Sequence, residues 1–209
     1  MDANLRRWLA VSGLLFVILA VAAVTVISSV PDNTASVAKV LSYYTQHKDS
    51  GYVTAILLEG AVVVALCFFW YLRNLLVDAG ADARLTTLGF AGAIVFGVGG
   101  AVGGGMKWVM SDAVSHVTPA TLQGLNAVQD DLNTILSGAG SALLLFATSI
   151  AIIKSGALPK WLGWLGIGLG AVSLADLIGP VPVAIWVLVA SVVLVATSKQ
   201  AAVTPATTS

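Results

Sequence analysis

The chain has 209 residues, of which 58% are hydrophobic and only 10% are charged, and its mean hydropathy is +0.95. Because an average soluble domain is about 25% charged, this composition excludes a soluble globule and indicates a protein of the lipid bilayer. Ten basic and ten acidic residues balance to zero without a Lys/Arg cluster, which excludes nucleic acid as a partner. The single cysteine, Cys67, excludes an intrachain disulfide.

An apolar run at residues 8–29 predicts the first transmembrane helix. Arg6 and Arg7 precede this run, and a charged start before apolar residues is also typical of a secretory signal peptide. The apolar part of about 20 residues exceeds the roughly 7 to 15 of a signal peptide, and it contains no convincing cleavage site. We therefore expect an uncleaved span.

The polar segment 31–51 contains one helical pattern. Its apolar residues recur at positions i, i+3, i+4 and i+7, as Val37, Val40, Leu41 and Tyr44. This spacing predicts a short amphipathic helix that lies at the membrane interface.

Residues 52–72 predict the second span. It ends in a run of aromatic residues followed by Arg73, a pattern typical of the headgroup region. Glu59 is the only charged residue inside this span. An ionisable side chain within a span is rare and usually faces the protein interior, so Glu59 is a candidate functional residue.

Residues 85–110 predict the third span, and this run carries eight glycines with no charge before Lys107. In lipid such a helix persists, and its bare glycine surface lets other helices approach closely. The segment Gly100–Gly105 has the glycine spacing of a phosphate-binding loop, but Met106 precedes the lysine and Trp108 replaces the required Ser/Thr. We therefore expect a central packing helix that contacts at least three others.

Three further apolar runs predict the remaining spans, at residues 132–153, 161–178 and 182–197. Thr118 before Pro119 marks a helix start, so the fourth span is expected to begin outside the membrane as one long helix. The small polar residues of the tail, 199–209, predict disorder. The predicted fold is all-α, with a single transmembrane domain of six helices over residues 1–198.

The distribution of basic residues predicts the orientation of this bundle. Six spans place seven basic residues on one side of the membrane: Arg6, Arg7, Arg73, Arg84, Lys154, Lys160 and Lys199. They place three on the other side: Lys39, Lys48 and Lys107. Because positively charged segments are retained in the cytoplasm, both termini are expected to be cytoplasmic.

The segment 158–166, Leu-Pro-Lys-Trp-Leu-Gly-Trp-Leu-Gly, combines a turn, a lysine, two interfacial tryptophans and packing glycines. It resembles the LPxWLGWLG signature that precedes a fifth span in a bacterial membrane protein family, domain of unknown function 4386. The resemblance implies a six-span protein of the bacterial inner (cytoplasmic) membrane. It brings no catalytic residues with it.

Catalytic and cofactor chemistry has little support in the sequence. A membrane haem requires histidines within spans, whereas His47 and His116 both fall in predicted loops. His47 with Asp49 and His116 with Asp112 would have to converge to hold an ion, and solvated loop residues are the favoured interpretation. No Ser/His/Asp order or buried Cys/His pair is available, so we expect no catalytic residues, cofactor or metal site.

Three functional classes remain, in order of preference. The first is a non-enzymatic accessory, interaction or sensory protein, which binds a membrane protein partner or another copy of itself. The second is a small transporter or ligand-binding bundle, whose candidate polar site in the extracytoplasmic half comprises Glu59, Lys107 and Asp176. The alternative for these residues is a neutral, hydrogen-bonded Glu59 and a solvated Asp176. The third class is an enzyme or electron carrier.

Overall fold

The structure is a computed structural model that describes residues 3–27, 30–175 and 180–203. Within these ranges the chain forms seven α-helices and no strand: α1 (Ala3–Val26), α2 (Val37–Gln46), α3 (Lys48–Asp78), α4 (Ala83–Ala113), α5 (Pro119–Ser155), α6 (Lys160–Leu174) and α7 (Val181–Val203). By length and composition, α3, α4 and α5 can each cross a membrane. The chain is therefore an all-α protein with at least three helices that can span a bilayer.

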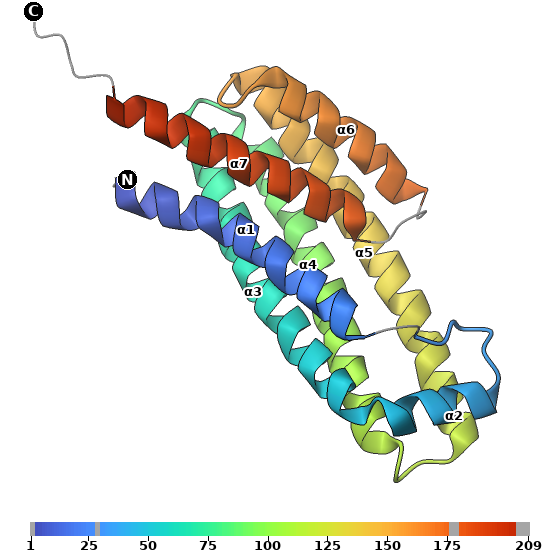
Figure 1. The fold of residues 1–209 in the computed structure, drawn as a ribbon. Helices are drawn as coiled ribbons and strands as arrows, with labels where there is room; N and C mark the ends of the chain where they lie inside the picture. The colour runs from blue at the N-terminus through green and yellow to red at the C-terminus, as the bar shows by residue number, and fades with distance from the viewer. Residues whose placement is uncertain (1–2, 28–29, 176–179, 204–209) are drawn as a thin grey trace, which may run out of the picture.

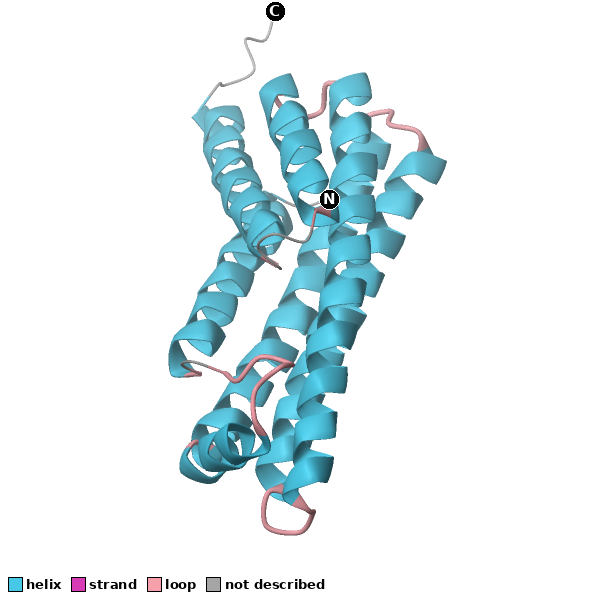
Figure 2. Cartoon of the chain, turned by 90° about the vertical axis from the view of Figure 1, so that its right-hand side faces the viewer, coloured by secondary structure: helices cyan, strands magenta, loops and turns pink. Residues whose placement is uncertain are grey.

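The three long helices form the body of the molecule, and the others are arranged around it (Figure 1). α6 lies along α5, α1 lies along α3, and α7 runs beside α1 and also contacts α6. The start of α1 and the end of α7 lie at the same end of the molecule. α2 lies at the opposite end, across the ends of the long helices, as the side view also shows (Figure 2).

Glycine allows α4 and α5 to approach each other at backbone distance. A Cβ atom on Gly92 would collide with the backbone of Leu144, and one on Gly140 would collide with the backbone of Phe96. Side chains larger than hydrogen would therefore separate these helices. The prediction that the glycines of this span serve close packing is confirmed.

The glycine helix contacts α2, α3 and α5, so the predicted minimum of three neighbours is confirmed. The helix with the most neighbours is nevertheless α5, which contacts α2, α3, α4, α6 and α7. Its apolar face packs into the main core, where Leu144, Leu145 and Ile152 are fully buried. The bundle is thus organised around the α4–α5 pair rather than around α4 alone.

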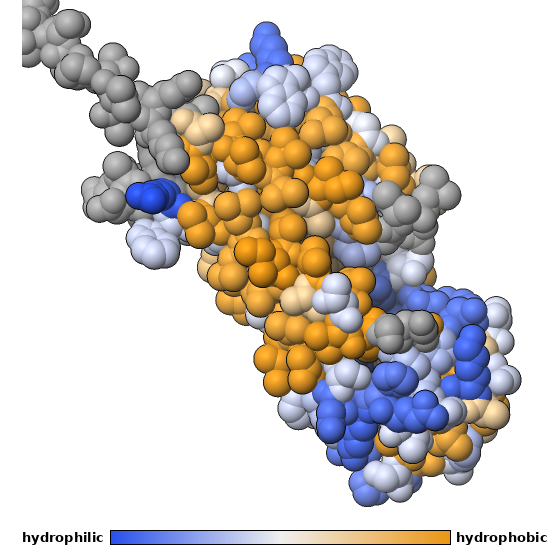
Figure 3. Space-filling view, viewed as in Figure 1, coloured by the Kyte–Doolittle hydropathy of each residue, from blue (hydrophilic) through white to orange (hydrophobic). Residues whose placement is uncertain are grey.

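Two aromatic contacts mark the two borders of the apolar surface. Tyr52 packs against Trp108 with ring centroids 4.8 Å apart, and Trp70 packs against Phe90 at 5.4 Å. Positions 52 and 70 of α3 differ by 18 residues, a rise of about 27 Å, close to the roughly 30 Å of a bilayer core. The surface coloured by hydropathy shows apolar side chains over the helices above α2 and hydrophilic ones over α2 itself (Figure 3).

The polar part of the molecule is built by helices that are longer than a membrane requires. α5 has 37 residues, which rise about 55 Å, whereas a bilayer core needs about 20 residues. It starts at Pro119, and the Thr118 hydroxyl accepts the Thr121 backbone N–H at 3.3 Å, so the predicted long helix is confirmed. We call α2, residues 30–36 and the adjoining ends of α3, α4 and α5 the polar head.

Some boundaries differ from the sequence-based expectations. α7 includes Pro182 in its first turn, where a missing N–H is tolerated, and it continues to Val203, into the expected disordered tail. α6 ends at Leu174, before the expected end at residue 178, and residues 176–179 lie outside the described ranges. The helix expected in segment 31–51 exists as α2, but its apolar face packs on protein.

Candidate functional site

The short helix α2 is held in the polar head by its cap and its apolar face. The Ser36 hydroxyl accepts the Lys39 backbone N–H at 3.4 Å, which satisfies one donor at the helix start. The buried residues of α2 join a small separate core: Ala35, Val40, Tyr43, Tyr44, Met110 and Leu122. These residues come from α2, α4, α5 and the preceding loop, so the head has an apolar core of its own.

A buried hydrogen-bond chain connects this core to α5. The Tyr44 hydroxyl donates to Asn126 Oδ1 at 3.1 Å, and Asn126 Nδ2 donates to the carbonyls of Pro31 at 3.1 Å and Asp32 at 3.3 Å. Gln123 Nε2 donates to the Ala35 carbonyl at 2.8 Å. α5 thereby holds both α2 and the loop that leads into it.

The protonation states in the head follow from burial and hydrogen bonding. Burial, together with the neighbouring Tyr43 and Asp130, raises the pKa of Tyr44 well above its ordinary value. At the surface, hydrogen bonds from Thr34 lower the pKa of Asp32. At neutral pH the Tyr44 phenol is therefore a neutral donor, and Asp32 is a carboxylate.

Lys107 is the buried cation at the base of the polar head, with 8% of its surface exposed. Its ammonium group donates to Gln129 Oε1 at 3.3 Å, and the carboxylate that acts on it electrostatically is Asp130. Two other hydroxyls, Thr54 Oγ1 of α3 and Ser111 Oγ of α4, are also buried and have no hydrogen-bond partner among the described residues. Lys107 thus lies in a buried polar contact between α4 and α5.

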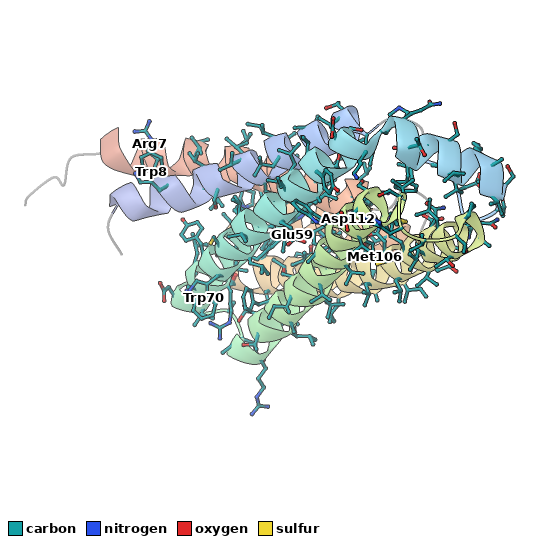
Figure 4. The ribbon with its side chains drawn as sticks, turned by 90° about the horizontal axis from the view of Figure 1, so that it is seen from below. Arg7, Trp8, Glu59, Trp70, Met106 and Asp112 are labelled. Carbon is teal, nitrogen blue, oxygen red and sulfur yellow. The ribbon has the colours of Figure 1, made fainter. Side chains whose placement is uncertain are left out.

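Glu59 lies on the outside of the same helices. Its side chain is exposed, and its Oε1 atom would lie 3.4 Å from a Cβ on Gly104 of α4. Figure 4 shows it on α3, between Trp70 and the end of α4 that carries Asp112. Glu59 is therefore a surface residue within the apolar band rather than an interior one.

Of the three predicted site residues, the structure describes Glu59, which is exposed, and Lys107, which is buried. Lys107 lies one turn beyond both Gly103, which faces Asn133 of α5, and Gly104, which faces Glu59 of α3. Its ammonium group donates to Gln129 of α5. No hydrogen bond or ion pair joins Glu59 to Lys107 within the described side chains. The third residue, Asp176, lies outside the described residues.

The two histidines, His47 and His116, have different surroundings. The His47 ring stacks on Tyr43 with centroids 4.6 Å apart, and its Nδ1 atom lies 3.0 Å from the Tyr43 carbonyl oxygen. His116 is exposed after the end of α4. Across the described part of the chain, no group of three or more His, Cys, Asp or Glu side chains is placed to hold a metal ion.

Sequence reasoning missed the polar face of α5, although its signal is present. Side chains with amide or hydroxyl groups recur every three or four residues along this helix, as Asn126, Gln129, Asn133 and Ser137. All four are at least partly buried, and two of them bind Tyr44 and Lys107. Helical spacing of amides ahead of an apolar run was therefore the informative pattern.

The arrangement supplies buried hydrogen-bond donors and acceptors. An ammonium group has three N–H donors, and Gln129 accepts from one of those on Lys107. The family resemblance of residues 158–166 stays a prediction. No family model, curated protein or solved structure matches the chain.

Proposed function

We propose that this chain is a six-span protein of the bacterial inner membrane, and that it acts without catalysis by presenting the polar head to a partner outside the cytoplasm. The three long apolar helices, the shorter apolar segments Ala10–Val26 and Val181–Ala196, and α6 supply the six spans. Arg7, Arg73, Arg84, Lys154 and Lys160 belong to helix ends on the side of the molecule where α1 starts. Their charge supports a cytoplasmic position for that side.

The observation that carries the proposal is the separate, cross-linked core of the head. A bundle that only spans a membrane needs no 37-residue helix and no second apolar cluster. Hydrogen bonds from Asn126 and Gln123 fix the loop and α2 against α5. A surface that is already ordered loses less conformational entropy when a partner binds, so it suits an accessory or sensory role.

A ligand-binding or transporting bundle is the second candidate. Buried Lys107 and the unpartnered hydroxyls of Thr54 and Ser111 favour it, because such groups line polar sites within membranes. Glu59 is exposed and so does not belong to this group of buried polar side chains. An accessory or sensory protein remains the preferred function because it uses the whole head.

The topology is tested with single cysteines at Ser115 and Ser198 in a Cys67→Ala background. An impermeant thiol reagent applied to intact cells should label Ser115→Cys and should label Ser198→Cys only after the membrane is permeabilised. Labelling of Ser198→Cys from outside would overturn the cytoplasmic placement of the C-terminus.

The interaction is tested in cells with a photoreactive residue at exposed head positions Ser42 and Thr45, and at lipid-facing Ile56 as the matched control. The head positions should give a discrete protein adduct, identified by mass spectrometry, and Ile56 should not. The Lys107→Met substitution separates the two candidate functions. The protein adduct at the head positions should persist in this variant if the head binds a partner, whereas a ligand-binding bundle should lose its ligand. If no head position gives an adduct, the partner-binding proposal fails.

A further inference from the structure

Two arginines lie on the lipid-facing surface where α3 ends and α4 begins. Arg73 is half-buried one turn beyond Trp70, and its guanidinium carbon lies 5.3 Å from the centre of the Trp70 ring. Arg84 is exposed in the first turn of α4. The Trp70–Phe90 contact places this region at the border of the apolar surface, where phospholipid headgroups lie.

The hydrogen bonds of Arg73 leave part of its guanidinium group unused. Its Nε and Nη2 atoms donate to Thr87 Oγ1 at 3.4 and 3.1 Å, and Nη1 donates to Asn74 Oδ1 at 3.1 Å. A guanidinium group carries five N–H donors, so two remain available. Within the described side chains, no carboxylate lies at ion-pair distance from Arg73 or Arg84.

The nearby acidic residues have other surroundings. The Asp82 carboxylate accepts the Arg84 backbone N–H at 2.8 Å and so caps the start of α4. Asp78 is exposed at the end of α3. Neither carboxylate pairs with the two arginines in the described structure, so their charges are open to an anion from outside the chain.

A shallow, wide-open depression of about 510 Å³ lies along one face of α4 and is lined by Ala83, Arg84, Thr87, Leu88 and Ala91. Its floor changes along α4 from a polar end at Arg84 and Thr87 to an apolar end at Leu88 and Ala91. A smaller cavity of about 10 Å³ behind Arg73 is at the lower limit for one water molecule. A ligand of any size must therefore occupy the open depression and not the interior.

We propose that this depression, together with Arg73, which donates to Thr87 in its lining, binds one anionic phospholipid of the leaflet at the basic end of the molecule. The phosphate oxygens accept hydrogen bonds from Arg84 and from the two remaining donors of Arg73. The acyl chains lie along Leu88 and Ala91. Guanidinium groups match phosphate geometry, and basic pockets beside membrane helices bind anionic headgroups. This site goes beyond the proposed function, since it requires a bilayer and no protein partner.

The test is native mass spectrometry of the full-length protein with phosphatidylglycerol and, separately, phosphatidylcholine. We expect phosphatidylglycerol to bind about tenfold more tightly, and Arg84→Gln to remove most of that difference. Lys160→Gln is the matched control, because it removes an exposed positive charge at the same end of the molecule. It should leave the preference intact.

Arg73→Gln should lower the preference further, and thermal unfolding checks that this variant is folded. Because Arg84 is exposed, Arg84→Gln tests the site even if Arg73→Gln does not fold. Equal retention of the two lipids, or an equal loss in Lys160→Gln and Arg84→Gln, would overturn the proposal. Displacement of phosphatidylglycerol by inorganic phosphate at equal concentration would also overturn it, because the ligand would then be a free anion.

Discussion

Tyr44 connects α2 to α5 by one buried hydrogen bond, and its protonation state makes this bond sensitive to alkali. In the unfolded chain the phenol has its ordinary pKa of 10.0, and burial raises the pKa in the folded state. Above pH 10 the folded state therefore binds more protons than the unfolded state, so stability falls as the pH rises. The stabilising contribution is fully present below pH 10.

Tyr44→Phe should remove part of this alkaline loss. At neutral pH the variant should lose about 1 kcal/mol, because Asn126 loses its donor. Between about pH 10 and about pH 12 its unfolding free energy should fall less steeply than that of the parent protein, by up to about 1.4 kcal/mol per pH unit. Equilibrium unfolding in detergent measures both effects. An unchanged slope would contradict the burial of this phenol.

The charged Lys107 donates a buried hydrogen bond to the neutral amide of Gln129, and removing either side chain leaves the other without its partner. We expect Gln129→Leu to cost about 1.5 to 3 kcal/mol. The double variant Lys107→Met with Gln129→Leu should cost less than the sum of the two single variants, because neither member of the pair is left behind without the other. Gln46→Leu, at an exposed glutamine of α2, is the control and should cost less than about 0.5 kcal/mol. Strict additivity would contradict a direct interaction.

Within α5, alanine is expected to have opposite effects on stability at two glycine positions, Gly140 and Gly124. A Cβ atom on Gly140 would collide with the Phe96 backbone, whereas one on Gly124 would meet no atom within 4 Å. Gly140→Ala should therefore destabilise the bundle by about 1 to 3 kcal/mol. Gly124→Ala should be neutral or stabilise it by up to about 1 kcal/mol, because alanine favours the helix. Thermal unfolding of both variants measures the two effects. Equal stability of the two variants would contradict close backbone contact at Gly140.

The elements were largely predictable because their signals are local. Apolar length indicated the long helices, Thr118 and Pro119 indicated the start of α5, and the spacing of Val37 to Tyr44 indicated α2. The partner of α2 was not predictable, since an amphipathic face indicates only that something apolar covers it. That face lies on Met110 and Leu122, which are distant in sequence.

The candidate site was less predictable than the fold, because it depends on the rotation of each helix about its axis. Glu59 and Lys107 lie at similar depths, which the sequence indicates by counting residues. Their different exposure depends on how α3 and α4 are each rotated about their axes, since Glu59 is exposed on α3 and Lys107 is buried against Gln129 of α5. That rotation is set by glycine contacts between helices, which no single segment of sequence specifies.

At the scale of the whole molecule, α5 should cross from water into lipid along one continuous helix. Gly124 and Ile135 are both exposed on it, the first in the polar head and the second within the apolar band. In a Cys67→Ala background reconstituted in vesicles, a polar thiol reagent should label Gly124→Cys at least about tenfold faster than Ile135→Cys, because thiolates form and react in water. In protein that is unfolded in denaturant, the two labelling rates should be equal. Equal rates in vesicles would place both positions outside the bilayer.

The short helix α6 has a consequence for the lipid around the protein. Its 15 residues rise about 22 Å, which is less than the roughly 30 Å of a bilayer core, and it is flanked by Trp161 at one end and exposed Leu174 at the other. By contrast, α3 is long enough to cross a full bilayer core. In the six-span arrangement proposed above, the bilayer is therefore thinner beside α6 than beside α3, and such a mismatch favours membranes or regions with shorter acyl chains. In that arrangement the thickness of the bilayer acts on the stability of the protein.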